Sequence, residues 1–256
     1  MSDGLSLLPL ADVLDEARRI GTLAQASGVR ARLLGGCGVA LHAHREIPAA
    51  LRRTYGDLDY VVRRSDGAAF RRMLEASGYE PNARFNALHG HRRTLHYDPL
   101  HERQVDTFVG DFAMCHALEL RDRLPDDGLS LAPVDLLLTK LQIVEVNDKD
   151  LVDVLVLLVE HAVDAGPEAI DPNRLAAIVG RDWGWYTTLS DNLEKLAERT
   201  GSIEGIEPDL RARLVARIEE VRAVVEGAPR SLGWRARAVV GRRMPWYELP
   251  EEVAGR

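Results

Sequence analysis

The spacing of hydrophobic residues changes near residue 132 of the chain. Before this point, short hydrophobic runs typical of strands alternate with segments of helical spacing. Strands are predicted at 31–34, 58–62, 79–83, 94–97 and 104–109. Helices in this part are predicted at 9–27, 37–44 and 66–77. Ser65 is expected to cap the last of these helices, and Gly78 is expected to end it.

After residue 132, nearly every segment has helical spacing. Pro133 suits the first turn of a helix over 133–146, and Asn147 with Asp150 resembles a capping pair for a helix over 147–163. Further helices are predicted at 173–179, 185–200, 208–226 and 232–240. The pattern therefore predicts an α+β fold, with a mixed-sheet domain over residues 1–132 and a helical domain over residues 133–256.

Composition narrows the possible classes of protein. The chain has 256 residues, of which 46% are hydrophobic, so it can bury a sizeable core. A net charge of -7 gives no general attraction to nucleic acid. The two cysteines, Cys37 and Cys115, are too few for a disulfide framework or a cysteine zinc cluster. The longest hydrophobic run, at 151–159, is interrupted by Asp153. We therefore expect a cytoplasmic protein with no membrane-spanning segment.

Two short motifs indicate chemistry on phosphates. Gly35 and Gly36 stand between a predicted strand and a predicted helix, where glycines let backbone N–H groups approach phosphates closely. Asp57 and Asp59 lie two positions apart in or next to a strand, so their side chains share one face. Two carboxylates this close repel each other unless a cation lies between them, and their hard oxygens suit Mg²⁺. Either motif alone is common as a tight turn or as surface charge, but their order favours a nucleotide site.

These motifs, together with Asp106 in the hydrophobic run 105–108, resemble the nucleotidyltransferase superfamily with its DNA polymerase beta-like palm. The run 53–61, Arg-Thr-Tyr-Gly-Asp-Leu-Asp-Tyr-Val, is similar to the subset that contains lincosamide nucleotidyltransferases and abortive-infection toxin nucleotidyltransferases. Segments 133–141 and 149–155 are similar to the helical part of the same subset. The resemblance covers roughly residues 31 to 160.

The resemblance implies a reaction and roles for the site residues. A nucleoside monophosphate would move from a nucleoside triphosphate to a hydroxyl acceptor, and pyrophosphate would be released. Asp57 and Asp59 would hold the triphosphate-bound Mg²⁺, while Asp106 would join them around a second Mg²⁺ ion and help to deprotonate the acceptor hydroxyl. Gly35, Gly36 and Arg53 would bind the nucleotide. The acceptor would be a small molecule, a tRNA or a protein.

Lys140 lies on the hydrophobic stripe of its predicted helix, where an unpaired ammonium would be costly to bury. Two anionic partners are possible, namely Asp153 in the neighbouring hydrophobic helix and the triphosphate itself. The sequence favours neither, because buried ion pairs occur without catalytic duties. Lys140 is therefore predicted as a nucleotide-binding residue, with Asp153 supporting it.

Several alternatives remain open from the sequence. The 20 residues between Gly36 and Asp57 exceed the usual spacing of the family, with 44–49 as the apparent insertion, which allows a non-catalytic nucleotide-binding or partner-binding module. The toxin-type resemblance also allows a toxin with a neutralising partner. Near the C-terminus, five arginines interleave with Trp234 and Trp246. They either grip nucleic acid or, as we favour, belong to a helix docked on the rest of the chain.

Overall fold

The computed structural model describes residues 8–43 and 46–249. Its centre is a five-stranded mixed sheet with strand order β1-β2-β5-β4-β3. β2 pairs with β5 in parallel, and the other neighbouring strands are antiparallel. The strands are β1 (Ala31–Leu34), β2 (Leu58–Val62), β3 (Glu80–Pro81), β4 (Arg93–Asp98) and β5 (Arg103–Val109). A separate hairpin consists of β6 (Phe112–Ala113) and β7 (Ala117–Leu118).

One face of the sheet packs on α1 (Val13–Ala26) and α3 (Gly67–Ala76). Leu58, Tyr60 and Val62 of β2 point to this side and join Ile20 and Phe70 in one buried cluster. The alternation follows from the two-residue period of a strand. Asp12 caps α1 because its side chain accepts hydrogen bonds from the backbone N–H groups of residues 14 and 15.

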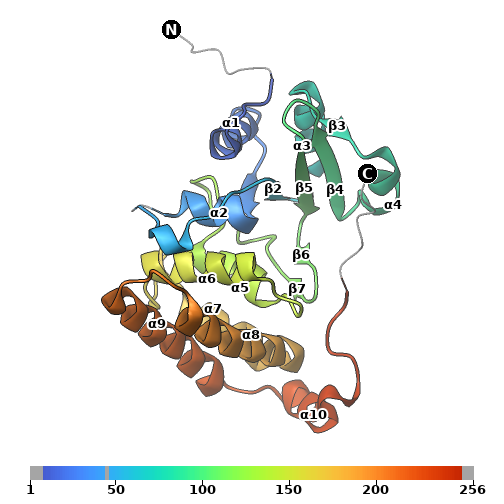
Figure 1. Ribbon diagram of the computed structural model, residues 1–256. Helices are drawn as coiled ribbons and strands as arrows, with labels where there is room; N and C mark the ends of the chain where they lie inside the picture. The colour runs from blue at the N-terminus through green and yellow to red at the C-terminus, as the bar shows by residue number, and fades with distance from the viewer. Residues whose placement is uncertain (1–7, 44–45, 250–256) are drawn as a thin grey trace.

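The other face of the sheet packs on the helical part of the chain. Val61 and Phe108 share a second core with the helices that follow residue 132. Figure 1 shows these helices below the sheet, with α10 at the lower right and the chain after it rising beside β6 and β7. The helices after residue 132 are α5 (Pro133–Leu141), α6 (Asp148–Glu160), α7 (Pro172–Arg181), α8 (Trp183–Ser202), α9 (Pro208–Gly227) and α10 (Leu232–Val240). Before residue 132, the described chain also contains α2 (Gly35–Leu41) and α4 (Ala83–His89). Short 3-10 turns are η1 (Ala49–Leu51) and η2 (Gly241–Arg243).

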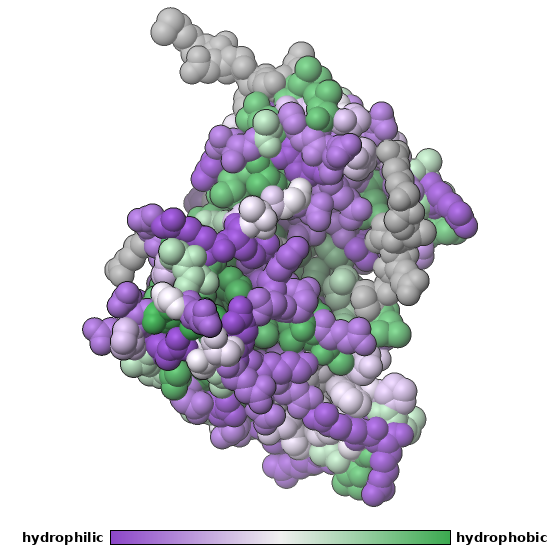
Figure 2. Space-filling model, in the orientation of Figure 1, coloured by the Kyte–Doolittle hydropathy of each residue, from purple (hydrophilic) through white to green (hydrophobic). Residues whose placement is uncertain are grey.

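The structure confirms the predicted α+β class, with a mixed sheet and a helical C-terminal region. Since both parts contribute to one hydrophobic core, the division into domains at residue 132 stays a prediction. Among the described residues, no helix combines the length and hydrophobicity needed to cross a membrane. Figure 2 shows hydrophilic residues over most of the visible face, with hydrophobic ones in separate patches.

Some predicted element boundaries were wrong, for local reasons. α5 ends at Leu141 rather than near residue 146, because the Asn192 side chain takes up the carbonyl groups of Leu141 and Ile143. α2 begins directly at Gly35 instead of residue 37. Ser65 caps nothing: α3 begins at Gly67 without a side-chain cap.

The region before β4 also differs from the sequence prediction. The strand predicted at 79–83 shortens to β3, because Asn82 begins helix α4 by accepting the backbone N–H of Phe85. The short hairpin β6–β7 was not predicted, since two-residue strands carry no periodicity that a sequence can show.

Candidate active site

The glycine turn lies between β1 and α2, as the sequence predicts. Gly35 has a φ of +64°, a conformation that favours glycine, and it begins α2 directly after the strand. A Cβ atom at Gly35 would overlap Asp59 Oδ2, and one at Gly36 would overlap the guanidinium of Arg53. Only glycines therefore allow the turn to lie between a carboxylate of β2 and the side chain of Arg53.

The 20-residue connection between Gly36 and Asp57 does not separate the two motifs. β1 and β2 pair so that Leu34, which precedes the turn, lies opposite Asp59. Within the connection, Pro48 directly precedes the 3-10 turn η1 as its N-cap residue. Residues 44 and 45 of the predicted insertion lie outside the described residues.

The third predicted carboxylate lies next to the second. In the parallel pairing of β2 and β5, Asp59 lies opposite Asp106, and neighbouring strands are about 4.8 Å apart. Both residues share the sheet face of Val61 and Phe108, which packs on the helices. The sheet therefore brings Asp59 and Asp106 together on the side that faces the helical region. Asp57 directly precedes the first residue of β2, Leu58.

The electrostatics of Asp59 reflect its burial next to two other carboxylates. Burial raises the pKa of Asp59 to about 7, and repulsion from Asp106 and Asp57 adds to this, against attraction from Lys140 and Arg93. Near neutral pH, the carboxyl group therefore retains a proton for about half of the time in the absence of a cation. A divalent cation beside Asp57 and Asp59 would displace this proton and relieve the repulsion.

Asp106 has a partner that the sequence did not reveal. Arg93 Nε lies 3.0 Å from both carboxylate oxygens of Asp106, and Arg93 Nη2 lies 2.5 Å from Oδ2. Burial, with repulsion from Asp57, still raises the pKa of Asp106 against the pull of Arg93. Within the described residues, no three acidic, histidine or cysteine side chains are arranged to hold a metal ion. The set of three carboxylate ligands stays a prediction.

Arg53 and Lys140 converge on one acidic side chain. Arg53 Nε and Nη2 lie 2.7 and 2.6 Å from the two oxygens of Asp153, and Lys140 Nζ lies 2.9 Å from Asp153 Oδ2. Lys140 also lies 2.7 Å from Asp150 Oδ1, a second partner that the sequence analysis missed. Burial opposes the charge of Lys140, but Asp153 and Asp150 outweigh burial and raise its pKa. The structural pair of Lys140 and Asp153 is confirmed, while the role of Lys140 in nucleotide binding stays a prediction.

Tyr55 completes the surroundings of the turn and was also missed by the sequence analysis. The guanidinium of Arg53 lies 4.3 Å from the centroid of the Tyr55 ring, a cation–π arrangement. The ring edge lies so close to Gly36 that a Cβ atom there would come within 2.9 Å of Tyr55 Cδ1. Arg53 is thus held over the glycine turn from two sides, by the ring and by Asp153.

We expect Gly35→Ala to distort the carboxylate site, with Gly28→Ala as its control. Gly28 has a nearly identical φ of +67° but nothing within 4 Å of its Cβ position. The control should lose about 1–2 kcal/mol of stability from backbone strain alone. Gly35→Ala should lose more, because its methyl group displaces Asp59, and should also lose nucleotide binding. Thermal unfolding with and without Mg²⁺ and triphosphate measures both effects; equal losses in the two variants would contradict the contact with Asp59.

The fold and this site together define the class of nucleotidyltransferases. The chain belongs to a family described as uncharacterised nucleotidyltransferase, whose model matches residues 11–163, more than half of the chain. The match includes the glycine turn, the three carboxylates and the pairing of Arg53 and Lys140 with Asp153. This confirms the nucleotidyltransferase superfamily, and hence nucleotidyl transfer as the general reaction.

Among solved structures, the chain is similar to an antigenic nucleotidyltransferase-like protein from Paracoccidioides brasiliensis. The sequences are 14% identical, the TM-score is 0.43, and the match covers 81% of this chain and 94% of the other. No curated protein matches the sequence at a significant level.

Proposed function

We propose that the protein is a metal-dependent nucleotidyltransferase that moves a nucleoside monophosphate from a nucleoside triphosphate to a hydroxyl acceptor and releases pyrophosphate. One observation carries the proposal. The Gly35–Gly36 turn is in contact with Asp59 on one side and with the guanidinium of Arg53 on the other. A triphosphate bound at the turn would therefore meet a carboxylate pair suited to a cation and an arginine suited to phosphate oxygens.

Asp57 and Asp59 are the residues that fit Mg²⁺. Their oxygens are hard donors, and the raised pKa of Asp59 reflects repulsion that a cation would relieve. Bound Mg²⁺ would supply neutralisation of triphosphate charge at the reacting phosphorus. Asp106 would become a ligand of a second ion only after its carboxylate leaves Arg93, so we assign the first ion to Asp57 and Asp59 alone.

The remaining site residues position the two reactants. Backbone N–H groups at Gly36, the guanidinium of Arg53 and the ammonium of Lys140 would bind phosphate oxygens, with Asp153 holding both cations near the turn. Asp106 would accept the proton of the attacking hydroxyl, which its raised pKa favours. Arg93 would hold the Asp106 carboxylate in the plane needed for that transfer.

We propose the subset of lincosamide and abortive-infection toxin nucleotidyltransferases as the nearest relatives in mechanism. Support comes from where its similar segments lie: the run 53–61 contributes Arg53 and β2, and the segments 133–141 and 149–155 contribute Lys140 and Asp153. In this proposal the acceptor is a small molecule or a tRNA, the protein acts in the cytoplasm, and a toxin would additionally have an antitoxin-type partner.

A second candidate is a nucleotide-binding module without turnover. The contact between Arg93 and Asp106 favours it, because an arginine on the third carboxylate competes with a metal and with proton acceptance. The two candidates differ in whether pyrophosphate is released, so one experiment separates them.

The test follows two labels. Triphosphates labelled at the α- or the γ-phosphate are incubated with the full chain, Mg²⁺ and a cell extract. Transfer should place the α label in an acceptor and the γ label in pyrophosphate, and chelation of Mg²⁺ should abolish both. Asp57→Asn should lose at least about a thousandfold in rate, the effect of removing roughly 4 kcal/mol of transition-state stabilisation.

Glu204→Gln is the matched control for this test. Glu204 is exposed in the loop before α9, far along the chain from the site, and its replacement removes one carboxylate charge. Its rate should stay unchanged. Triphosphate binding without any pyrophosphate, across all four nucleotides and the whole extract, would refute transfer and favour the module.

A further inference from the structure

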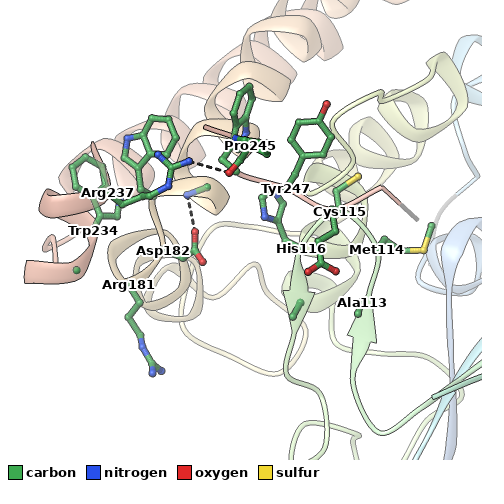
Figure 3. A pocket seen from close by; sticks show the side chains of 16 residues that line it. Ala113, Met114, Cys115, His116, Arg181, Asp182, Trp234, Arg237, Pro245 and Tyr247 are labelled. Carbon is green, nitrogen blue, oxygen red and sulfur yellow. Dashed lines mark hydrogen bonds between the residues drawn. The ribbon is translucent and has the colours of Figure 1, made fainter. Parts of the chain in front are cut away.

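A large cavity lies where the C-terminal segment meets the helical region. Its volume is about 510 Å³, and it is formed by the β6–β7 hairpin, the junction of α7 and α8, α10 and residues 245–248. Figure 3 shows Arg237 and Trp234 on one side of the cavity and Tyr247 above His116 on the other. Three of the four tryptophans of the chain line it: Trp183, Trp234 and Trp246.

The segment that closes this cavity is held by directed contacts instead of a hydrophobic core. No residue of α10 is buried. Arg237 stacks on Trp183 at 4.8 Å, and its Nη2 donates to the carbonyl groups of Met244 and Pro245 at 2.9 and 3.1 Å. The Trp246 indole N–H donates to Thr188 Oγ1 at 3.1 Å. These contacts fix the side chains of Trp183 and Trp246 beside the hollow.

The lining suits a flat molecule without large net charge. Two arginines, Arg181 and Arg237, are balanced by two carboxylates, Asp182 and Glu248. Burial lowers the pKa of His116 to about 4, so its imidazole is neutral near pH 7. Aromatic walls favour stacking on a planar ring, and the volume falls within the roughly 300–1,000 Å³ of small-molecule sites. A polyanion is disfavoured by the carboxylates and by the net charge of -7.

A second cavity adjoins this hollow on the side of strands β4 and β5. It measures about 90 Å³ and shares Ala113, Met114 and Glu248 with the larger one. Its other walls include Arg93 and Phe108. Arg93 donates to Asp106, the residue opposite Asp59 in the sheet. The smaller cavity thus places Arg93, the hydrogen-bond partner of Asp106, next to the larger cavity.

We infer that the tryptophan-lined cavity binds the planar aromatic ring of a small hydroxyl-bearing acceptor, whose hydroxyl extends through the smaller cavity towards Asp106. This inference rests on the proposed nucleotidyl transfer and names the acceptor class that it uses. The hydroxyl oxygen would form the new bond to the α-phosphorus as the bond to pyrophosphate breaks, and its proton would pass to Asp106. Most of the cavity lining lies beyond residue 163, outside the segment that the family model matches.

The test uses tryptophan fluorescence of the full chain, because all four tryptophans lie at this cavity: three line it, and the Trp185 ring is 5.2 Å from that of His116. Pyridoxine and tryptophol are ring-bearing alcohols, cyclohexylmethanol is a matched alcohol without a planar ring, and an oligoadenylate presents the same ring chemistry from RNA. We expect saturable binding of at least one ring-bearing alcohol below about 1 mM, and no comparable binding of the other two probes. Isothermal titration confirms the affinity where a probe absorbs light.

Two variants locate the binding. Ala113→Phe fills the junction of the two cavities from an exposed position and leaves every tryptophan in place. Trp246→Leu removes one wall. Each substitution should lower the affinity for the alcohol at least about tenfold, as expected for loss of a stacking contact or of space. The control is Val215→Ala, at an exposed position of α9, which should leave the affinity unchanged.

The two proposals fail in different ways. The bound alcohol should reduce label transfer to extract acceptors at least about tenfold when it saturates the cavity. Four outcomes would overturn the acceptor site. The alcohol could bind without this competition, or its binding could survive in Ala113→Phe. The oligoadenylate alone could bind, or no ring-bearing alcohol could bind at all. Absence of pyrophosphate release, with ring binding intact in Asp57→Asn, would instead overturn the proposed transfer.

Discussion

Replacing Asp59 by Asn is expected to abolish nucleotide transfer while making the metal-free protein more stable above pH 7. The loss of activity follows from the role of Asp59 as a cation ligand, and we expect at least about a thousandfold decrease in kcat/KM. The gain in stability follows from the raised pKa of Asp59, which is about 7 in the folded protein because of burial and of the nearby Asp106 and Asp57 carboxylates.

The sign of the stability effect follows from proton binding. Well below pH 4, the Asp59 carboxyl is protonated in both the folded and the unfolded chain, so it contributes no difference. Between pH 4 and about 7 the unfolded chain has lost this proton and the folded protein retains it, so the free energy of unfolding falls as the pH rises. Above pH 7 the loss stays constant, and asparagine avoids it because its side chain does not ionise.

The size of the gain can be bounded. A shift of the Asp59 pKa from 3.8 to about 7 corresponds to a free energy of about 4 kcal/mol. We expect about half of this, because residue Asp59 is only partly buried. At roughly 2–4 °C for each kcal/mol, the melting temperature of Asp59→Asn should exceed that of the wild type by about 4–8 °C at pH 8. The difference should shrink towards pH 4.

Asp57→Asn is the matched control for this experiment. Asp57 is exposed, so its replacement should remove activity without a comparable gain in melting temperature. Thermal unfolding between pH 4 and 8, with and without Mg²⁺, measures all three proteins. Mg²⁺ should raise the melting temperature of the wild type but not that of Asp59→Asn. A difference that is independent of pH, or a variant less stable than the wild type at pH 8, would disprove the assigned protonation.

The features that the sequence predicted correctly are local in the chain. Gly35 and Gly36 follow a strand and precede a helix, and both facts can be read within a few residues. The shared face of Asp59 and Asp106 follows from alternation in each strand, once the two strands are neighbours. The need of Lys140 for an anionic partner was predictable, because an ammonium among hydrophobic residues requires an anion, and Asp153 is one of the two partners that the sequence offered.

The features that the sequence did not predict depend on strand register and on packing. Arg93 reaches Asp106 only because β4 pairs with β5 so that Arg93 lies opposite Phe108, two residues further along. A one-residue change of register would have moved the arginine to the other face. The end of α5 depends on Asn192, which is 51 residues away from Leu141 in the sequence. No periodicity within either segment carries this information.

The C-terminal arginines illustrate the same limit. Their spacing between tryptophans was compatible with a basic nucleic-acid surface or with a docked helix. In the structure, three of them stack on aromatic rings of the same region: Arg230 on Tyr186 and Trp234, Arg237 on Trp183, and Arg242 on Trp246. Arg242 also pairs with Asp191 at 2.6 Å. These contacts within the chain favour the docked helix as their structural role, and Arg237 also lines the tryptophan-lined cavity.

The largest loss of stability is expected for Asp153→Ala. Asp153 is fully buried and accepts hydrogen bonds from Arg53 of the sheet-containing part and from Lys140 of α5. Removal of this carboxylate would leave two cations without their shared partner, and breaking a buried pair costs about 3–5 kcal/mol. The contact also joins residues 100 positions apart in the sequence, so its loss should loosen the packing of α6 against the segment that precedes β2.

Asp150→Ala is the control that isolates the role of Asp153. Lys140 keeps Asp153 in this variant, and Arg53 is untouched, so the loss should be about 1.5–3 kcal/mol, as for one hydrogen bond to a charged group. Urea unfolding at pH 7 measures both free energies, with an unchanged slope required for the comparison. Similar losses in the two variants would show that Lys140 alone carries the stabilisation. A much larger loss in Asp153→Ala would show that the carboxylate that holds Arg53 over the glycine turn also stabilises the fold. The proposed phosphate site and the stability of the protein would then depend on the same side chain.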